Sequence, residues 1–349
     1  MTTLPQLFVG IDYHLKFSTV CVLTMDGELL FHENCESSAE YIDKYVRWRL
    51  ECGQKVRLRA AVEACSGTAK LAEDLRQLGW EIELAHPATV ARLRKNLDKS
   101  DKQDAHVLAD LVRVGYLPRV YLAPERQRQL RSLVRYRQQL AKQRGQIKLR
   151  IRGLMREAHL CITGSSAWTI MWVTTLRERI DELGEERSWI CERYLDELKH
   201  VKKQLCEAEK RLLPVARAAP GCDRLLAQPG IGLITAAMLL AEIGDFSRFR
   251  NGKQLSRYCG LAPVNCSSGE RQRQSGIGKA CNGDLRRILI EASHRLSRYV
   301  PRWRQMKQHL ISQGKRRPVA AVAVANRWLR RLHFEMTRPA DVVQEDVAV

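Results

Sequence analysis

Short apolar runs alternate with amphipathic segments over the first 125 residues. Runs that are rich in β-branched residues and end at turn residues predict strands, whereas apolar spacings of three and four predict helices. Asp26-Gly27 supplies a tight turn between the second and third runs. The predicted strands are Leu7–Ile11, Ser18–Met25, Glu28–His32, Val56–Val62 and Glu81–Leu84, and the predicted helices are Ala39–Leu50 and Thr68–Leu78. The order βββαβαβ, followed by another helical pattern near Leu97–Leu111, predicts an α/β domain.

Beyond residue 125 the apolar patterns are helical in several separate segments. Between Arg126 and Arg156 apolar residues recur every seven positions, at Leu133, Leu140, Ile147 and Leu154. This spacing predicts a long helix with a narrow apolar seam. A second helical pattern covers Leu176–Leu212. The two segments therefore predict an antiparallel hairpin or an intermolecular coiled coil, with a Gly/Ser turn at Cys161–Ala167 between them.

The last third of the chain contains further helical patterns. Leu225–Asp245 has two apolar segments around Pro229-Gly230-Ile231-Gly232, which is typical of a helix-hairpin-helix but also of an ordinary helical turn. A short helix is expected within Phe246–Leu261, and an alanine-rich helix over Val319–Arg331. We therefore expect an α/β plus all-α protein with three parts: residues 1–125, a helical arm at 126–215, and a helical domain at 216–349.

The charge of the chain restricts the kind of partner. The formal charge is +20 and the calculated isoelectric point is about 9.8, so a polyanion such as nucleic acid or a membrane surface is expected. No apolar run reaches transmembrane length and no secretory leader is evident, which favours a soluble, cytoplasmic protein that binds nucleic acid. The 11 cysteines contain no C-x-x-C motif and are expected to be reduced thiols.

Four carboxylates occupy positions that suggest a common site. Asp12 and Glu63 each end a predicted central strand, where sites in α/β sheets usually lie. Asp101 and Asp104 are three residues apart and share one helix face. Each acid alone is also explained as a helix cap or a surface residue. Together they predict a cluster that binds Mg²⁺, with two ions about 4 Å apart clamping a phosphodiester.

The first arm segment is a candidate nucleic-acid contact. Residues 126–156 contain 11 Lys and Arg residues and no Asp or Glu. A solvated helix face normally mixes both signs of charge, so this composition favours contact with a phosphate backbone, without base specificity. The candidate contacts are Arg131, Arg135, Lys142, Lys148 and Arg152.

The C-terminal domain contributes further candidates. A glycine-rich turn at the start of a helix presents backbone N–H groups to phosphate, which makes Gly230 and Gly232 candidate contacts. A Ser-Ser-Gly turn at residues 267–269 is followed by three cations that could hold a phosphate: Arg271, Arg273 and Lys279. A serine hydroxyl needs a base or a metal to become a nucleophile, and no histidine lies nearby in the sequence. On these residues alone, a simple turn beside solvated bases is the more economical interpretation.

Four sequence blocks resemble the DEDD transposases of bacterial insertion sequences. They are GIDYH at Gly10–His14, VEACSGT at Val62–Thr68, KSDKQDA at Lys99–Ala105, and the long block GLAPVNCSSGERQRQSGIGKACNGDLRR at Gly260–Arg287. The resemblance implies a RuvC-like N-terminal domain with an RNase H core, whose four acids are Asp12, Glu63, Asp101 and Asp104. It also implies a serine nucleophile before a glycine, which is Ser268, with Ser267 as the alternative. Cys281 departs from the family pattern, where glycine is usual.

The resemblance also implies partners and an assembly. Such enzymes pair donor and target DNA through a bridge RNA that the element encodes, and they act as dimers or tetramers with sites composed between protomers. Two other functions are compatible with the residues: a junction-resolving nuclease in which water attacks and Ser268 is a bystander, and a non-catalytic nucleic-acid scaffold.

Overall fold

The computed structural model describes residues 5–51, 56–93, 101–164, 166–265, 274–278 and 281–338. The chain forms two compact units, Met1–Ala123 and Pro124–Val349. Each unit has hydrophobic cores of its own. None of the described helices is both long enough and apolar enough to span a membrane.

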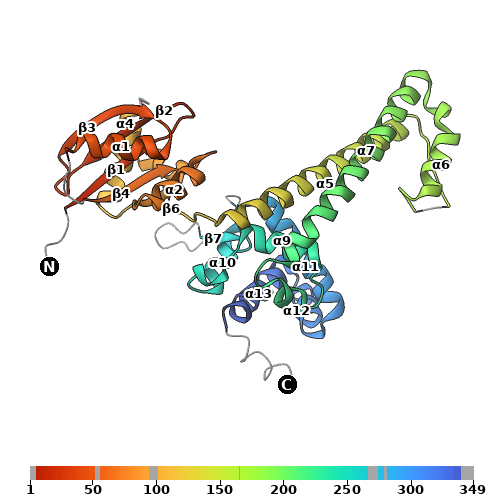
Figure 1. The fold of residues 1–349 in the computed structure, drawn as a ribbon. Coiled ribbons are helices and arrows are strands. Elements are labelled where there is room, and N and C mark those ends of the chain that lie inside the picture. Colours follow the sequence, from red (N-terminus) through yellow and green to blue (C-terminus); the bar gives the residue numbers. More distant parts are fainter. Residues whose placement is uncertain are drawn as a thin grey trace. The chain divides into compact units, whose positions relative to one another are not determined.

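The first unit is built on a mixed six-stranded sheet in the order β3-β2-β1-β4-β5-β6 (Figure 1). β1, β2 and β3 form an antiparallel meander, β4 and β5 run parallel to β1, and β6 is antiparallel to β5. The strands are β1 Gln6–Asp12, β2 Phe17–Leu23, β3 Leu29–Glu36, β4 Arg57–Glu63, β5 Glu81–Ala85 and β6 Arg119–Val120. The five predicted strands are confirmed, β3 is longer than expected, and the two-residue β6 was not predicted.

Four helices accompany this sheet. Their bounds are α1 Ala39–Arg49, α2 Thr68–Gln77, α3 Pro87–Leu93 and α4 Asp101–Arg113. α1 and α2 were predicted, and α1 begins at Ser38, whose side chain accepts a hydrogen bond from the backbone N–H of Tyr41. α3 was not predicted, because its seven residues are too few to establish a helical period.

α4 packs closely over β1, β2 and β4. Its inner face consists of Ala105, Leu108, Ala109 and Val112, all buried at helical spacing. The close approach depends on Gly10 in β1, because a Cβ built there would lie 1.8 Å from the carbonyl oxygen of Ala105. The first turn of α4, with Asp101 and Asp104, is therefore held against the sheet beside the end of β1.

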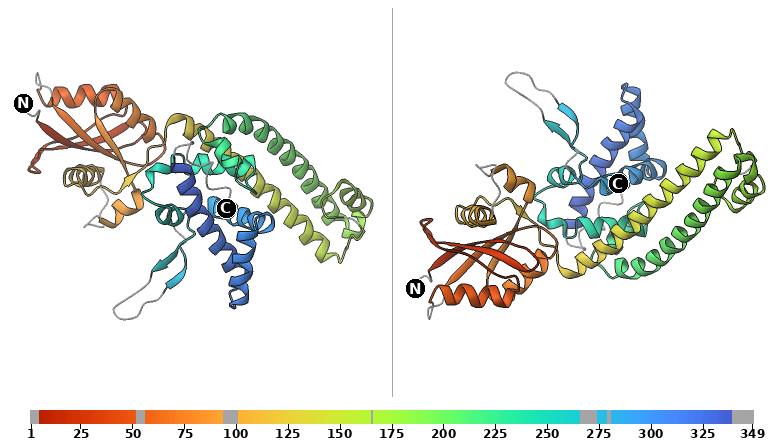
Figure 2. Two further views of the ribbon diagram at one scale, coloured as in Figure 1. Left: turned by 90° about the horizontal axis from the view of Figure 1, so that it is seen from below. Right: turned by 90° about the horizontal axis from the view of Figure 1, so that it is seen from above.

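The second unit contains a long helical hairpin formed by α5 Glu125–Glu157 and α7 Glu185–Arg217, seen in two views in Figure 2. Arg137 pairs with Glu209 at 2.7 Å, and Gln143 donates a hydrogen bond to Glu197 at 3.3 Å, so the helices are antiparallel within one chain. The hairpin alternative of the prediction is thus the one observed.

The start of the second arm helix differs from the prediction. Residues from Leu176 to Leu183 belong to α6 Ile170–Glu178 and to a short 3-10 helix, η1 Ile180–Leu183. Gly184 then has a φ of +84°, a conformation that interrupts the helix before α7 begins. The apolar spacing continues across this break because α6, η1 and α7 share one core with α5.

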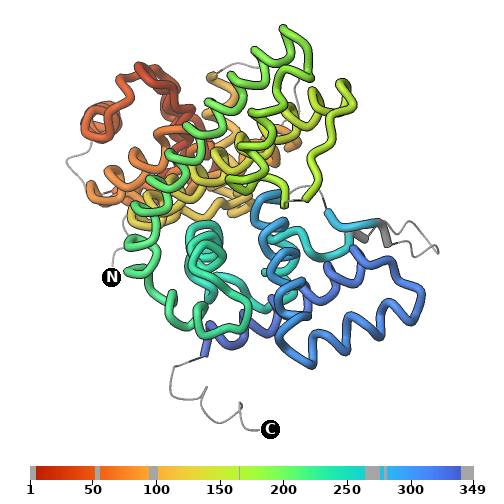
Figure 3. Tube along the Cα trace, turned by 90° about the vertical axis from the view of Figure 1, so that its right-hand side faces the viewer, coloured from red at the N-terminus to blue at the C-terminus, as the bar shows by residue number. Residues whose placement is uncertain are grey.

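The rest of the second unit is a helical bundle, drawn from green-cyan to blue in Figure 3. Its elements are α8 Cys222–Leu226, α9 Leu233–Glu242, η2 Phe246–Arg248, α10 Gly252–Tyr258, β7 Pro263–Asn265, β8 Gln274–Ile277, α11 Gly283–Tyr299, α12 Pro301–Ser312 and α13 Arg317–Thr337. The base of the arm shares this core through Leu130, Val134 and Leu212. The predicted alanine-rich helix is confirmed as α13, which is longer than expected.

Candidate active site

Asp12 and Glu63 lie at the same edge of the sheet. β1 and β4 are parallel neighbours, and Ile11 pairs with Val62 in their register. Asp12 and Glu63 are the next residue along each strand, so the two carboxylates follow the same step of the ladder at the carboxyl ends. The local sequence achieves this because, in both strands, the three residues before the acid are small or apolar and are buried.

α4 brings two more carboxylates to this edge. Asp12 is mostly buried, with 18% of its side chain exposed, whereas Asp101 is 65% exposed. His14 lies between them: its Nε2 atom is 3.3 Å from Oδ2 of Asp12 and 3.7 Å from Oδ2 of Asp101. Asp104 is half-buried on the same helix turn. His14 was not among the predicted site residues, although its position two residues after Asp12 is a usable sequence signal.

The charges of these groups affect the pKa of Asp12. Burial raises the pKa of Asp12, the charges of Asp104 and Asp101 raise it further, and His14 opposes the change. Partial burial likewise raises the pKa of the nearby Cys65 thiol, to which the charges of Asp12 and Glu63 contribute. The edge of the sheet is therefore a region of accumulated negative charge, which a cation would stabilise.

The arrangement fits a divalent metal ion. One ligand atom each from Asp12, His14 and Asp101 lies within 4.8 Å of the other two. Carboxylate oxygens are the ligands of hard cations such as Mg²⁺, and an imidazole nitrogen also suits Mn²⁺ and other transition metals. The raised pKa of Asp12 indicates that its negative charge is incompletely compensated by protein groups. A metal ion at this position would supply that compensation.

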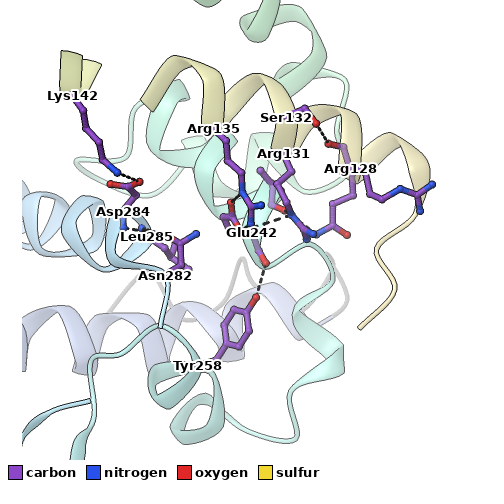
Figure 4. Close-up of polar contacts among 12 residues, drawn as sticks. Arg128, Arg131, Ser132, Arg135, Lys142, Glu242, Tyr258, Asn282, Asp284 and Leu285 are labelled. Carbon is purple, nitrogen blue, oxygen red and sulfur yellow. Dashed lines mark hydrogen bonds and ion pairs between the residues drawn. The ribbon is translucent and has the colours of Figure 1, made fainter. Parts of the chain in front are cut away.

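The predicted nucleic-acid contacts at the base of the arm are engaged with α9 (Figure 4). Arg135 donates two hydrogen bonds to the buried Glu242, at 2.8 and 3.0 Å. Arg131 donates to the carbonyl oxygen of Ala241 at 2.9 Å, and burial lowers its pKa. Tyr258 donates to the carbonyl oxygen of Glu242 at 3.0 Å. Glu242 was not among the predicted site residues, and its sequence signal is a single carboxylate at the end of an apolar helical pattern.

The other arm cations also have partners within the second unit. Lys142 pairs with Asp284 at 2.7 Å, at the start of α11. Lys148 and Arg152 lie over the Trp168 ring, 4.9 and 5.5 Å from its centre. Burial lowers the pKa of Lys148, and neighbouring cations add to this effect. Positive charge is thus concentrated in this part of the arm, while the basal cations also hold the arm in place.

The Pro-Gly-Ile-Gly turn lies between α8 and α9. Gly230 has a φ of +77°, and its carbonyl oxygen accepts a hydrogen bond from Arg295 at 3.0 Å. Gly232 precedes the first turn of α9. A cavity of about 450 Å³ is lined by this turn, the start of α9 and Arg295. The backbone N–H groups of a helix start and an arginine therefore lie together.

The candidate serine segment lies outside the described residues. This applies to Ser267, Ser268, Arg271, Arg273 and Lys279. The flanking strands β7 and β8 are paired antiparallel, with Pro263 opposite Ile277. In sequence, the serines thus fall between two strands of a hairpin.

Carboxylates that converge at the edge of a sheet form an arrangement suited to metal-assisted phosphodiester chemistry, which several kinds of nucleic-acid enzyme perform. Comparison with known sequences identifies the kind. Residues 9–160 match a transposase family of the DEDD type, and residues 222–308 match the family described as "Transposase IS116/IS110/IS902 family".

Individual relatives agree with these family matches. The chain is 30% identical over 287 residues to a probable family 20 transposase of Pseudomonas aeruginosa, covering 80% of this chain and 83% of that protein. It is 26% identical over 327 residues to the transposase for insertion sequence element IS1111A of Coxiella burnetii, covering 91% and 86%. A pilin gene-inverting protein of Moraxella bovis is 30% identical over 141 residues, covering 38% and 44%. The chain belongs to the IS110 family of insertion-sequence transposases.

Proposed function

We propose that this protein is a DNA recombinase that cuts and rejoins strands with a metal-binding carboxylate site and a serine nucleophile. The observation that carries the proposal is the convergence of Asp12, Asp101 and His14 at one edge of the sheet, with Asp104 and Glu63 contributing to the same negative region. The strand order β3-β2-β1-β4-β5 supports a RuvC-like assignment for residues 1–125. When bound, Mg²⁺, as two ions, would polarise the phosphate and stabilise the charge that develops on its oxygens.

The serine step conserves the phosphodiester bond. The Oγ atom of Ser268 attacks phosphorus and loses its proton, while the bond between phosphorus and one deoxyribose oxygen breaks. That sugar oxygen leaves with a proton, and the phosphate remains esterified to the serine. The reverse reaction with a different sugar hydroxyl rejoins the strands without an external energy source. The inversion activity named for the Moraxella relative supports such conservative chemistry, because inversion requires rejoining as well as cutting.

The remaining residues provide binding and positioning. In this proposal residues 126–215 act as a basic arm, with Lys148 and Arg152 as phosphate contacts. The turn at Gly230 and Gly232, beside Arg295, acts as a helix-hairpin-helix that binds a phosphate group. Arg271, Arg273 and Lys279 hold the reacting phosphate within the domain at residues 216–349. A bridge RNA selects donor and target DNA by base pairing, and protomers of a dimer or tetramer complete each other's sites.

Replacement of the serines tests the covalent step. Ser268→Ala should abolish strand exchange and the protein–DNA adduct that survives denaturation, whereas Ser267→Ala should retain both. The measurement is denaturing gel electrophoresis of the protein with end-labelled DNA. Strand exchange by Ser268→Ala at the wild-type rate contradicts the mechanism, and loss confined to Ser267→Ala would instead assign the nucleophile to Ser267.

The same variants separate the two rival functions. A junction-resolving nuclease needs the carboxylates and the metal but not Ser268, so it would cut branched DNA equally well in Ser268→Ala. A scaffold would be indifferent both to Asp12→Asn and to removal of Mg²⁺ by chelation.

The guide RNA has its own test. RNA that co-purifies with the protein should be sequenced and compared with DNA flanking the gene. A flanking transcript bound in stoichiometric amount is the expected result. Full activity of nuclease-treated protein on DNA alone contradicts guidance by RNA.

A further inference from the structure

The second unit has a basic segment of which the proposed function uses only Arg295. Residues 292–338 contain twelve Lys and Arg residues and one acid, Glu335. This excess of eleven matches that of residues 126–156, and the two segments together exceed the +20 of the whole chain, so the remainder is slightly acidic. Such concentration of charge on particular helices is typical of a surface that attracts a polyanion.

The basic segment lines a groove. A cavity of about 1330 Å³ lies among α10, α12 and α13, with part of its wall from the segment that joins α8 to α9. Five of its cations form no ion pair with any residue that the structure describes: Arg250, Lys253, Arg302, Arg327 and Arg330. The one carboxylate of the lining, Glu335, is 2.6 Å from Arg331. The groove therefore presents uncompensated positive charge from three helices.

Two aromatic residues add to the chemistry of the groove. Phe334 lines it with 49% of its surface exposed, and the guanidinium of Arg338 lies 3.7 Å from its ring centre. Trp328 also lines it and is 2% exposed. The indole N–H of Trp328 is buried and has no hydrogen-bond acceptor among the described residues. A buried donor without an acceptor raises the free energy of the folded protein, so a hydrogen bond from Trp328 to an oxygen atom of a ligand would be favourable.

We propose that this groove binds an unpaired single strand of the DNA on which the transposase acts. Exposed guanidinium and ammonium groups suit the phosphates of one strand, and an exposed ring suits stacking with a base. A duplex has its bases stacked inside, so they are not available to stack on Phe334. DNA is chosen over RNA because membership of a transposase family implies a DNA substrate. The proposal depends on the family and not on the metal or serine chemistry.

Matched triple variants test the site in the full-length protein. The groove variant is Lys253→Ala, Arg302→Ala and Arg327→Ala, all exposed lining residues. The control variant is Arg298→Ala, Arg304→Ala and Lys315→Ala, which removes three exposed cations of the same segment outside the lining. Binding of a labelled 15-nucleotide DNA strand is followed by fluorescence anisotropy across a salt series in EDTA.

The groove variant should bind the single strand at least about tenfold more weakly than wild type. The slope of log affinity against log salt concentration should be shallower by about 2. Each phosphate contact on a single strand contributes about 0.7 to this slope, and the variant removes three contacts. The control should stay within about threefold of wild type. Equal losses in the two variants would mean diffuse attraction rather than a groove and would overturn the proposal. An equal or larger loss for duplex DNA, or for RNA of the same sequence, would also overturn it.

Chemical protection locates the strand independently of affinity. Bound single-stranded DNA should protect Lys253 from acetylation and leave Lys315 reactive, as measured by mass spectrometry of the digested protein. Phe334→Ala should weaken binding by roughly tenfold, the loss of one stacked base. Unprotected Lys253 in the saturated complex would exclude the groove. Because both experiments lack divalent metal, failure of the carboxylate or serine chemistry leaves their outcomes unchanged.

Discussion

Gly10 links the packing of the first unit to its acidic site. The residue has no side chain, which allows the backbone of α4 at Ala105 and Ala109 to cross directly over β1. The helix start that carries Asp101 and Asp104 is thereby brought to the strand end that carries Asp12. In the sequence, Gly10 looks like one more small residue of a strand, and its role follows only from the helix above it.

Gly10→Ala should therefore damage both stability and the site. A Cβ at residue 10 must push α4 away, which is expected to cost about 1–3 kcal/mol or more of unfolding free energy. Metal binding should weaken as well, because the carboxylates of α4 move relative to Asp12. The measurements are urea unfolding and Mg²⁺ titration. Gly153→Ala is the control: its Cβ meets nothing within 4 Å in α5, so it should stabilise by about 0.5–1 kcal/mol.

Asp12 has a second consequence for stability. Its pKa is raised by burial and by neighbouring acids. The unfolded chain releases the proton at the ordinary pKa, whereas the folded protein retains it to a higher pH. Stability of the metal-free protein thus falls as pH rises from the ordinary to the raised value, and stays lower above it.

Asp12→Asn should raise the melting temperature of the metal-free protein at neutral pH. It should also remove the stabilisation by Mg²⁺ and reduce strand cleavage more than about 100-fold, beyond the loss typical of residues outside the ligand shell. Calorimetry with and without Mg²⁺ measures the first two effects. A wild-type increase in melting temperature with Mg²⁺ in the variant would show that Asp12 does not hold the metal.

At the level of elements, the arm is fixed to the bundle by a charge pair. Glu242 is 4% exposed at the end of α9, and Arg135 and Arg131 of α5 supply its cations (Figure 4). Removal of this carboxylate leaves Arg135 without its ion pair and leaves Arg131 with the carbonyl oxygen of Ala241 as its partner. These basal arginines therefore support the structure of the arm, in addition to any contact with nucleic acid.

Glu242→Ala should destabilise the second unit by about 1.5–3 kcal/mol, the contribution of hydrogen bonds to a charged group, as measured by denaturant unfolding. Glu291→Ala, which removes an exposed partner of Arg287, is the control and should cost less than about 1 kcal/mol. Similar small losses in both variants would mean that the Glu242 pair is as weak as a surface pair.

At the scale of the whole molecule, the two units should be separable. The first has buried residues on both faces of its sheet and all four predicted carboxylates. The fragment of residues 1–123 should unfold cooperatively by circular dichroism, and its melting temperature should rise with Mg²⁺. The same fragment with Asp12→Asn should show no such rise. A non-cooperative transition would indicate that the first unit needs the second to fold.

The sequence patterns predicted the existence of helices and strands more accurately than the residues at which they begin and end. β1 and β4 were predicted because each contains a run of apolar or small residues that ends at an acid. β6 was missed because two residues carry no period. The second arm helix was predicted to begin at Leu176, whereas α7 begins at Glu185. Apolar spacing indicates which side chains share a core, but the break in the backbone at Gly184 depends on one φ angle.

The sequence by itself determined the class of the protein, through the acids at its strand ends, its net positive charge and the motifs of an insertion-sequence transposase. These features depend on residue type and spacing, which are visible in the sequence itself. The tertiary structure decided which groups meet. It placed His14 between Asp12 and Asp101, assigned Arg131 and Arg135 to Glu242, and gathered the cations of α10, α12 and α13 around one groove. Apart from the neighbouring pair Asp12 and His14, these contacts join residues far apart in the chain, and no local pattern encodes them.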